Sequence, residues 1–106
     1  MADTDSSPVV TDVPDQHRFE VRLDGELAGF AVYHRRGGRI YLVHTEVDPA
    51  FEGKGVGGAL ARHALDEVEA EGTRKVMPLC PFIKAWIGRH PDYIPLVYGA
   101  STGTAD

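Results

Sequence analysis

The segment "EVDPAFEGKGVGGALARHAL", residues 46–65, joins an expected strand to an expected helix through a glycine-rich turn. Glycines stand at Gly53, Gly55, Gly57 and Gly58, directly ahead of an apolar stripe at helical spacing. Glycine is a poor residue with which to begin a helix unless the backbone needs unusual angles or a ligand approaches it closely. The first amides of a helix lack internal acceptors, and the helix dipole is positive there. The segment therefore predicts a site for an anion, and we expect a pyrophosphate.

Length and composition describe a single globular domain of 106 residues, 42% hydrophobic and 25% charged. Eleven basic and sixteen acidic residues give a formal charge of -5, which argues against a nucleic-acid partner. No apolar run is long enough for a membrane span, and the N-terminus lacks the pattern of a signal peptide. The single cysteine excludes an internal disulfide and a four-cysteine zinc site. We expect a cytoplasmic protein with no metal and no membrane association.

Two tight turns, at Asp24-Gly25 and Gly37-Gly38, divide residues 19–47 into an antiparallel three-strand meander. Alternation of apolar and charged residues from Phe19 to Leu23 is typical of a half-buried strand. The turns set two registers that agree on one apolar face. The predicted opposite pairs are Val21 with Ala28, Phe19 with Phe30, Val32 with Val43, Phe30 with Thr45, and Tyr33 with Leu42.

The remainder of the chain alternates helices and strands. A helix with the apolar stripe of Val56, Leu60, Ala64 and Val68 ends at the glycine cap Gly72. A short strand, "KVMPLC", precedes a second helix, "FIKAWIGRH", and "YIPLVYG" forms a last extended segment. The predicted fold is an α/β sandwich with a mixed sheet, in which the meander is followed by β-α-β-α-β order. Residues 1–16 and 100–106 are expected to be disordered tails around a domain at 17–99.

Two familiar phosphate sites fit the glycine-rich turn poorly. The run "GKGVGG" is not followed by a ribose-binding acid in a βαβ unit, which argues against a dinucleotide site. It also lacks the G-K-[ST] ending of a P-loop. The stretch "EGKGVG", residues 52–57, instead resembles the Q/R-x-x-G-x-G/A signature of the GNAT-type N-acetyltransferases. With "PLCPF", "HPDY" and the β-strand order, the resemblance extends over nearly the whole predicted domain and points to the short, single-domain members that lack the N-terminal helices.

The resemblance implies that acetyl-CoA lies in a V between the strand ending near Val47 and the strand of Val76 to Cys80. It also implies that a backbone amide near Val47 polarises the thioester carbonyl. The pyrophosphate would be held along Glu52, Gly53, Lys54, Gly55, Val56, Gly57 and Gly58. Glu52 departs from the usual Gln or Arg, a change that weakens the motif only slightly because backbone amides are expected to hold the phosphates.

Three side chains are candidates for catalysis, and the first of them, Cys80, lies at the expected mouth of the V. Cys80 would accept the acetyl group as a thiolate in a two-step route, or would simply be a buried small hydrophobe. His44, predicted on the face shared with Leu42 and Glu46, would act as a general base, or would fix the bend before the loop. Glu46 is a second candidate base, or a solvated surface charge.

Tyr93 in "HPDY" would protonate the leaving CoA thiolate, a role that the resemblance implies, or would close the core as an amphipathic ring. His90 is expected to cap the C-terminal end of the second helix, and Trp86, with Phe82 and Ile83, to belong to the core. The basic hairpin tip of Arg35, Arg36 and Arg39 would meet an acidic partner or the CoA 3′-phosphate, or would be a solvated turn.

The sequence thus predicts an acetyl-CoA-dependent N-acetyltransferase acting on the amine of a protein or small molecule. A non-catalytic CoA or acyl-CoA binding module and a plain interaction domain are the alternatives. The sheet edge permits a monomer or a weak dimer.

Overall fold

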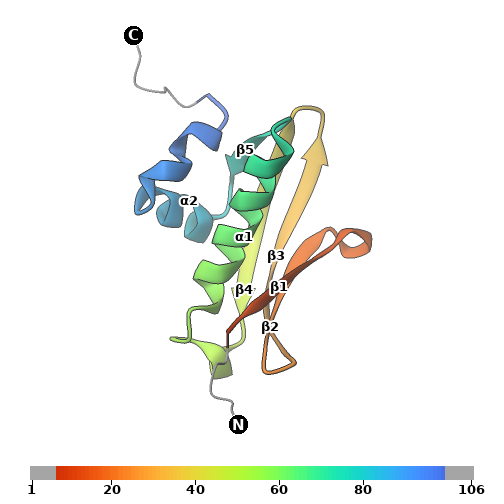
Figure 1. Ribbon diagram of the computed structural model, residues 1–106, viewed down its shortest axis with the longest axis vertical. Helices are drawn as coiled ribbons and strands as arrows, with labels where there is room; N and C mark the ends of the chain where they lie inside the picture. The colour runs from red at the N-terminus through yellow and green to blue at the C-terminus, as the bar shows by residue number, and fades with distance from the viewer. Residues whose placement is uncertain (1–6, 100–106) are drawn as a thin grey trace.

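A computed structural model describes residues 7–99 and contains one five-stranded sheet (Figure 1). The strands lie in the sheet in the order in which they follow along the chain. The first four strands pair antiparallel, and the fourth and fifth pair parallel. They are β1 (Val9–Val13), β2 (Arg18–Leu23), β3 (Glu26–Arg36), β4 (Arg39–Val47) and β5 (Lys75–Pro78).

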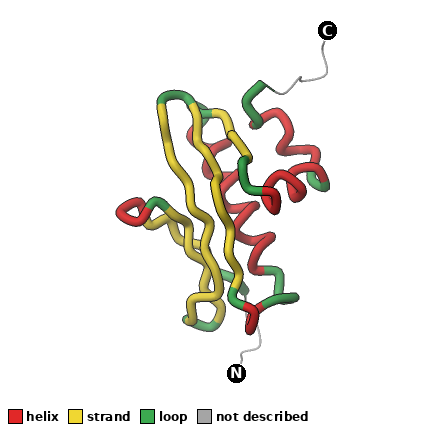
Figure 2. The backbone as a smooth tube through the Cα atoms, turned by 180° about the vertical axis from the view of Figure 1, so that it is seen from behind, coloured by secondary structure: helices red, strands yellow, loops and turns green. Residues whose placement is uncertain are grey.

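Helix α1 (Val56–Glu71) lies across one face of the sheet, and α2 (Pro81–Gly88) lies beside it near the β5 edge (Figure 1). Seen from behind, the strands lie in front of the helices, so within residues 7–99 no helix covers the second face (Figure 2). We call the side that carries α1 the core face and the opposite side the outer face. Three short 3-10 turns complete the fold: η1 (Pro14–Gln16), η2 (Pro49–Phe51) and η3 (Pro91–Leu96).

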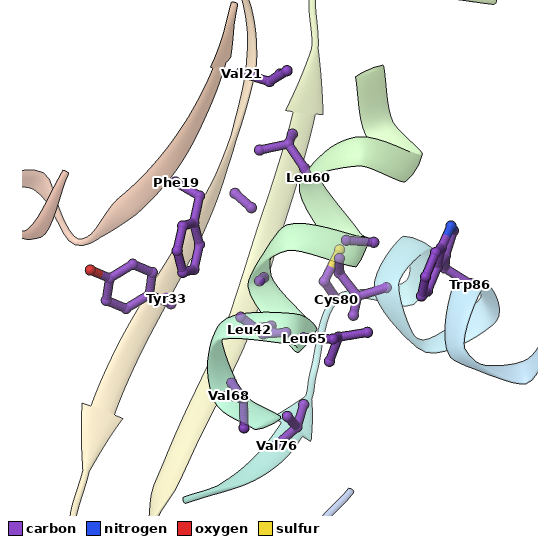
Figure 3. Packing of buried hydrophobic residues seen from close by; sticks show 14 of the residues in the cluster. Phe19, Val21, Tyr33, Leu42, Leu60, Leu65, Val68, Val76, Cys80 and Trp86 are labelled. Atoms are coloured by element: carbon purple, nitrogen blue, oxygen red, sulfur yellow. The ribbon is translucent and has the colours of Figure 1, made fainter. Parts of the chain in front are cut away.

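The core forms between α1 and the core face of the sheet, as the apolar stripe predicts. The four residues of the stripe are buried, and so are Ala61 and Leu65 beside them. They pack against sheet residues that include Phe19, Val21, Tyr33, Leu42 and Val76 (Figure 3). The helix ends where predicted, because Gly72 adopts a left-handed conformation (φ 71°) and donates its N–H to Val68 O at 3.1 Å.

The register of the first hairpin differs from the prediction by one residue. Val21 lies opposite Gly29 rather than Ala28, and Phe19 lies opposite Ala31 rather than Phe30. The register shifts between Val21 and Arg22, which leaves Ala28 as the extra residue of a β-bulge.

The second hairpin follows the prediction as far as Tyr33 opposite Leu42 and then shifts at a second bulge. Beyond it Val32 lies opposite His44, and Phe30 lies opposite Glu46, so Val43 is the extra residue. One additional residue reverses the sides on which the following side chains point. The prediction that His44 and Glu46 share a face with Leu42 is therefore wrong: Leu42 is buried, and both of the others are exposed.

Both predicted ends of the domain also need correction. Residues Val9–Val13, expected in a disordered tail, form β1 and pair with all of Arg18–Arg22. The extended segment expected at residues 93–99 is instead mostly the 3-10 turn η3, since Pro95 has no N–H to give to a strand ladder. Only Val97 forms a parallel bridge, to Val76. Residues 1–6 and 100–106 of the predicted tails lie outside the described residues.

Candidate functional site

A pocket of about 390 Å³ opens where β4 ends and α1 begins. Its floor and walls come from three parts of the fold, namely the end of β4, the glycine-rich loop and the start of α2. The lining residues are Thr45, Val47, Phe51, Glu52, Gly53, Gly55, Val56, Gly57, Gly58 and Phe82. Val47 and six of the seven residues predicted to hold the pyrophosphate thus meet at one pocket, and Lys54 alone is not among them.

The loop that carries the glycines is folded by short local hydrogen bonds. Asp48 accepts the Ala50 N–H on its side chain at 2.9 Å, and its carbonyl accepts the Phe51 N–H at 2.8 Å. Gly53 and Gly55 adopt left-handed conformations, with φ of 82° and 78°. No atom lies within 4 Å of the position that a Cβ would take on either residue, so the backbone faces open space there.

Helix α1 begins at this loop without a side-chain cap. Gly55 is the N-cap residue and no side chain bonds to the first turn. The first N–H groups of the helix have no acceptor within the helix, and the dipole concentrates positive charge at them. An uncapped helix start with bare backbone fits the oxygens of a pyrophosphate, which is the group that the sequence predicts for this place.

The other two glycines of the motif have a second reason, which is packing. A Cβ on Gly57 would lie 2.9 Å from Phe82 Cζ, and one on Gly58 would lie 3.4 Å from Trp86 Nε1. Both residues lie in the first turn of α1, where α2 crosses closely. Gly53 and Gly55 therefore shape the loop, while Gly57 and Gly58 let the two helices approach.

Three residues of the pocket were not predicted: Thr45, Phe51 and Phe82. Phe82 was expected in the core, yet it is 38% exposed and covers Gly57 from α2, whereas Ile83 and Trp86 are buried. Thr45 reaches the pocket because the Val43 bulge turns it to the core face. The spacing of Thr45 and Val47, two residues apart in one strand, was the available signal for a shared face.

Cys80 lies beside the pocket and is almost fully buried, with 4% of its surface exposed. Its Sγ donates a hydrogen bond to Thr45 Oγ1 at 3.4 Å, and its N–H donates to Leu42 O at 2.9 Å. These bonds fix the residue where β5 ends and α2 begins, next to the last β4–β5 pair of Leu42 and Pro78.

His44 and Glu46 form a pair on the outer face, with His44 Nε2 3.1 Å from Glu46 Oε1. The His44 ring also lies 6.3 Å from the ring of Phe30. Neither residue lines the glycine pocket, so the sheet separates this pair from Cys80 and Thr45.

Tyr93 is not placed at the pocket either. Its hydroxyl donates to Asp66 Oδ1 at 2.7 Å and accepts from Arg62 at 3.1 Å, which ties η3 to the exposed side of α1. The hydrogen bond to Asp66 and, after it, burial raise the pKa of Tyr93 above its ordinary value. His90 confirms its predicted place, because Nδ1 lies 2.8 Å from Trp86 O at the end of α2.

None of the described helices is both long and apolar enough to cross a membrane.

Comparison with known proteins gives one family and several relatives. Residues 18–96 match the family model described as GCN5-related N-acetyl-transferase. Over 54 residues the chain is 43% identical to streptothricin acetyltransferase of Streptomyces lavendulae, a match that covers 49% of this chain and 29% of the relative.

Two solved structures resemble the fold. One is the ribosomal-protein-S18-alanine N-acetyltransferase of Escherichia coli, with TM-score 0.53 and 30% identity, covering 56% of this chain and 38% of that chain. The other is the ribosomal-protein-alanine N-acetyltransferase of Brucella melitensis biovar Abortus 2308, with TM-score 0.56 and 20% identity, covering 84% of this chain and 66% of that chain. The matches thus span between 29% and 66% of these relatives. Because the family model covers most of the chain, the protein belongs to the GCN5-related N-acetyltransferase (GNAT) family.

Proposed function

We propose that this protein binds acetyl-CoA with its pyrophosphate at the start of α1 and transfers the acetyl group to a primary amine. The observation that carries the proposal is the uncapped α1 N-terminus, which faces a pocket of about 390 Å³. Membership of the GNAT family supports acetyl-CoA as the co-substrate. The names of the relatives given above state different acceptors, so we infer the acceptor from the residues of this chain.

The edge of β4 supports a position for the pantetheine arm and the thioester of acetyl-CoA along this strand. The last β4–β5 pair is Leu42 with Pro78, and the bulge at Val43 bends β4 immediately afterwards. Asp48 donates its N–H to Ala28 O at 2.8 Å, toward β3. Since amides alternate in direction along a strand, the N–H groups of Val47 and Thr45 point to the opposite, open edge. These groups are available to the amides of the pantetheine arm and to the thioester oxygen.

The chemistry requires a neutral amine that attacks the thioester carbon. A C–N bond forms, the C–S bond breaks, and CoA leaves as a thiolate that takes up a proton. We assign the amine proton to His44, whose exposed ring lies on the outer face with Glu46 beside it. The acceptor then approaches from the outer face and reaches the thioester where β4 and β5 no longer pair, beyond Leu42 and Pro78, while the CoA pocket lies on the core face. Direct transfer is favoured over a two-step route because the Cys80 thiol is buried and engaged by Thr45.

The test is calorimetric titration of CoA and acetyl-CoA into wild type and matched variants. We expect wild-type binding in the micromolar range, which corresponds to about -8 kcal/mol. Gly55→Asp places a carboxylate at the helix start and should abolish binding, whereas Gly55→Asn, with the same shape and no charge, should retain most of it. Glu52→Gln removes an exposed carboxylate from the pocket rim and should tighten binding by about twofold to fivefold.

Gly25→Asp is the control for the backbone, because Gly25 has a similar φ of 82° with open space around it and lies in a distant turn. Absence of binding in a wild type that is folded by circular dichroism would refute the proposal and leave the glycines as architecture. A non-catalytic module would bind both ligands and release no CoA from acetyl-CoA in the presence of amines.

A further inference from the structure

The end of the sheet farthest from the glycine loop is basic, although the chain carries a net charge of -5. Arg36 lies opposite Arg39 across β3 and β4, and Arg39 lies opposite Lys75 across β4 and β5. Within residues 7–99 none of these three cations forms an ion pair with a carboxylate. Arg39 stacks on the Tyr98 ring at 3.9 Å, and Lys75 Nζ donates to Pro95 O at 3.1 Å. Like charges in adjacent strands repel one another unless a partner neutralises them.

A groove of about 460 Å³ begins at this basic end and runs along the outer face. His34, Arg35 and Arg36 line one part of it, and Tyr41, Val43 and Leu79 line the other. Arg39 and Lys75 lie beside Arg36 in the adjoining strands. Val43 in β4 is 37% exposed, and Leu79, just after the end of the edge strand β5, is 57% exposed, so both offer apolar surface to a ligand. Val43 directly precedes His44, and Leu79 directly precedes Cys80. The groove thus connects the basic end to the place where the acceptor amine is expected.

The basic end is too far from the glycine loop to bind the CoA 3′-phosphate. Arg39 and Val47 are the two ends of β4. Eight residue steps of strand at about 3.3 Å each separate them by roughly 26 Å. The 3′-phosphate belongs to the nucleotide half of CoA, which the pyrophosphate site anchors beside the loop. The cations are therefore available to the other substrate.

Resting on the proposed function, we propose that the acceptor is a peptide segment in which carboxylates accompany the reacting amine. Its acidic side chains would meet Arg36, Arg39 and Lys75, and its apolar side chains would lie on Val43 and Leu79 in an extended conformation. Charge complementarity and the apolar floor fit this occupant. A continuous polyanion such as nucleic acid fits less well, because the chain as a whole carries a net charge of -5 and the three cations are confined to one end of the sheet.

The test compares two fluorescent decapeptides with a free α-amine, one lysine and one leucine, which carry either three glutamates or three glutamines. Fluorescence anisotropy is measured against the wild type saturated with CoA. We expect the glutamate peptide to bind about tenfold more tightly at low salt. The preference should shrink at about 0.5 M salt because surface charges are then screened. Arg36→Glu should remove it, whereas Arg89→Glu, the same change at an exposed residue outside the groove, should preserve it.

Calorimetry with acetyl-CoA on the same preparations separates the two proposals. If acetyl-CoA binds and the glutamate peptide shows no preference, the docking proposal is overturned while the proposed function stands. If acetyl-CoA does not bind the folded wild type, both are overturned. Displacement of the glutamate peptide by an equal concentration of a single-stranded oligonucleotide would also overturn the assignment, because it would show that the cations serve a nucleic acid.

Discussion

Cys80 has a side chain suited to covalent catalysis but surroundings that are not suited to it. A cysteine at the end of a strand beside an acyl site invites a covalent role, yet this thiol is 4% exposed and donates to Thr45. A nucleophile needs a thiolate that the thioester reaches, and a buried thiol in apolar surroundings is inert. Packing in the buried cluster and the hydrogen bond to Thr45 account for the residue without catalysis.

We therefore predict that wild type incubated with acetyl-CoA alone forms no acetyl-enzyme. Intact-mass spectrometry after acid quench measures this directly. Cys80→Ala should bind acetyl-CoA with unchanged affinity and lose about 1 kcal/mol of stability from the vacated volume. A covalent adduct on the wild type that is missing from Cys80→Ala would contradict the direct route and restore the two-step mechanism.

Single residues were predicted from the sequence with uneven success. Gly53 and Gly55 were recognisable because a left-handed backbone has few alternatives to glycine. The contacts of Gly57 and Gly58 with α2 were not, because they depend on where a helix more than twenty residues later crosses α1. Phe82 was placed in the core for the same reason. Its hydrophobicity is the same whether it lines a pocket or fills a core.

At the scale of elements, the β-bulge at Val43 is the feature that shapes the site. It lies at the point where β4 stops pairing with β5, and it sets Thr45 and Val47 on the core face. Deleting Val43 would leave Tyr33 opposite Leu42 and Val32 opposite His44, in a regular ladder with the same residues inside.

The deletion should therefore fold, with a loss of about 2 kcal/mol or less, and bind acetyl-CoA about tenfold more weakly. The reason is that β4 without its bulge would run closer to α2 and narrow the opening of the glycine pocket. Urea unfolding and calorimetry measure the two quantities. Val43→Ala retains the bulge and serves as the control. An unchanged affinity in the deletion variant would show that the bulge does not hold the site open.

Helices and strands were predictable where the spacing of apolar residues and the residues that end each element were clear. The stripe of α1 and its Gly72 cap determined both the helix and its end. Bulges leave no such mark, because Ala28 and Val43 are ordinary strand residues whose extra position appears only in the pairing. Strand β1 is five residues long, contains Asp12 and lies between Pro8 and Pro14, so its pairing with β2 rather than its own pattern keeps it in the sheet.

At the scale of the whole molecule, one partly buried cluster connects β1 to the middle of the sheet. Tyr33 of β3 donates its hydroxyl to Asp12 of β1, and Arg35 lies 3.6 Å from the same carboxylate. The Arg35 guanidinium also stacks on the Tyr33 ring at 4.5 Å. The contact crosses β2, so it joins two strands that do not pair.

Burial and, after it, the hydrogen bond to Asp12 raise the pKa of Tyr33 above its ordinary value of 10.0. A raised pKa in the folded state means that the contribution to stability is complete below pH 10 and is lost as the pH rises through the raised pKa. Tyr33→Phe should therefore cost about 1–2 kcal/mol at pH 7 and progressively less in alkaline solution.

The difference in stability between wild type and Tyr33→Phe, called the gap below, is measured from their urea midpoints at a series of pH values from 7 upward. Tyr98→Phe, at a tyrosine that is 48% exposed, is the matched control and should show a small gap throughout. A gap between wild type and Tyr33→Phe that widens above pH 10 would reverse the sign and exclude the linkage described here.

The agreement between the order of strands in the sheet and their order along the chain has a consequence for how the molecule folds. Each of the first three pairings joins neighbouring strands, and only the passage through α1 to β5 spans a longer loop. Short loops lose little entropy on closure, and chains dominated by local contacts fold quickly. The meander would thus form first, and the opening for the cofactor would be completed last, when β5 and α2 dock onto an existing sheet.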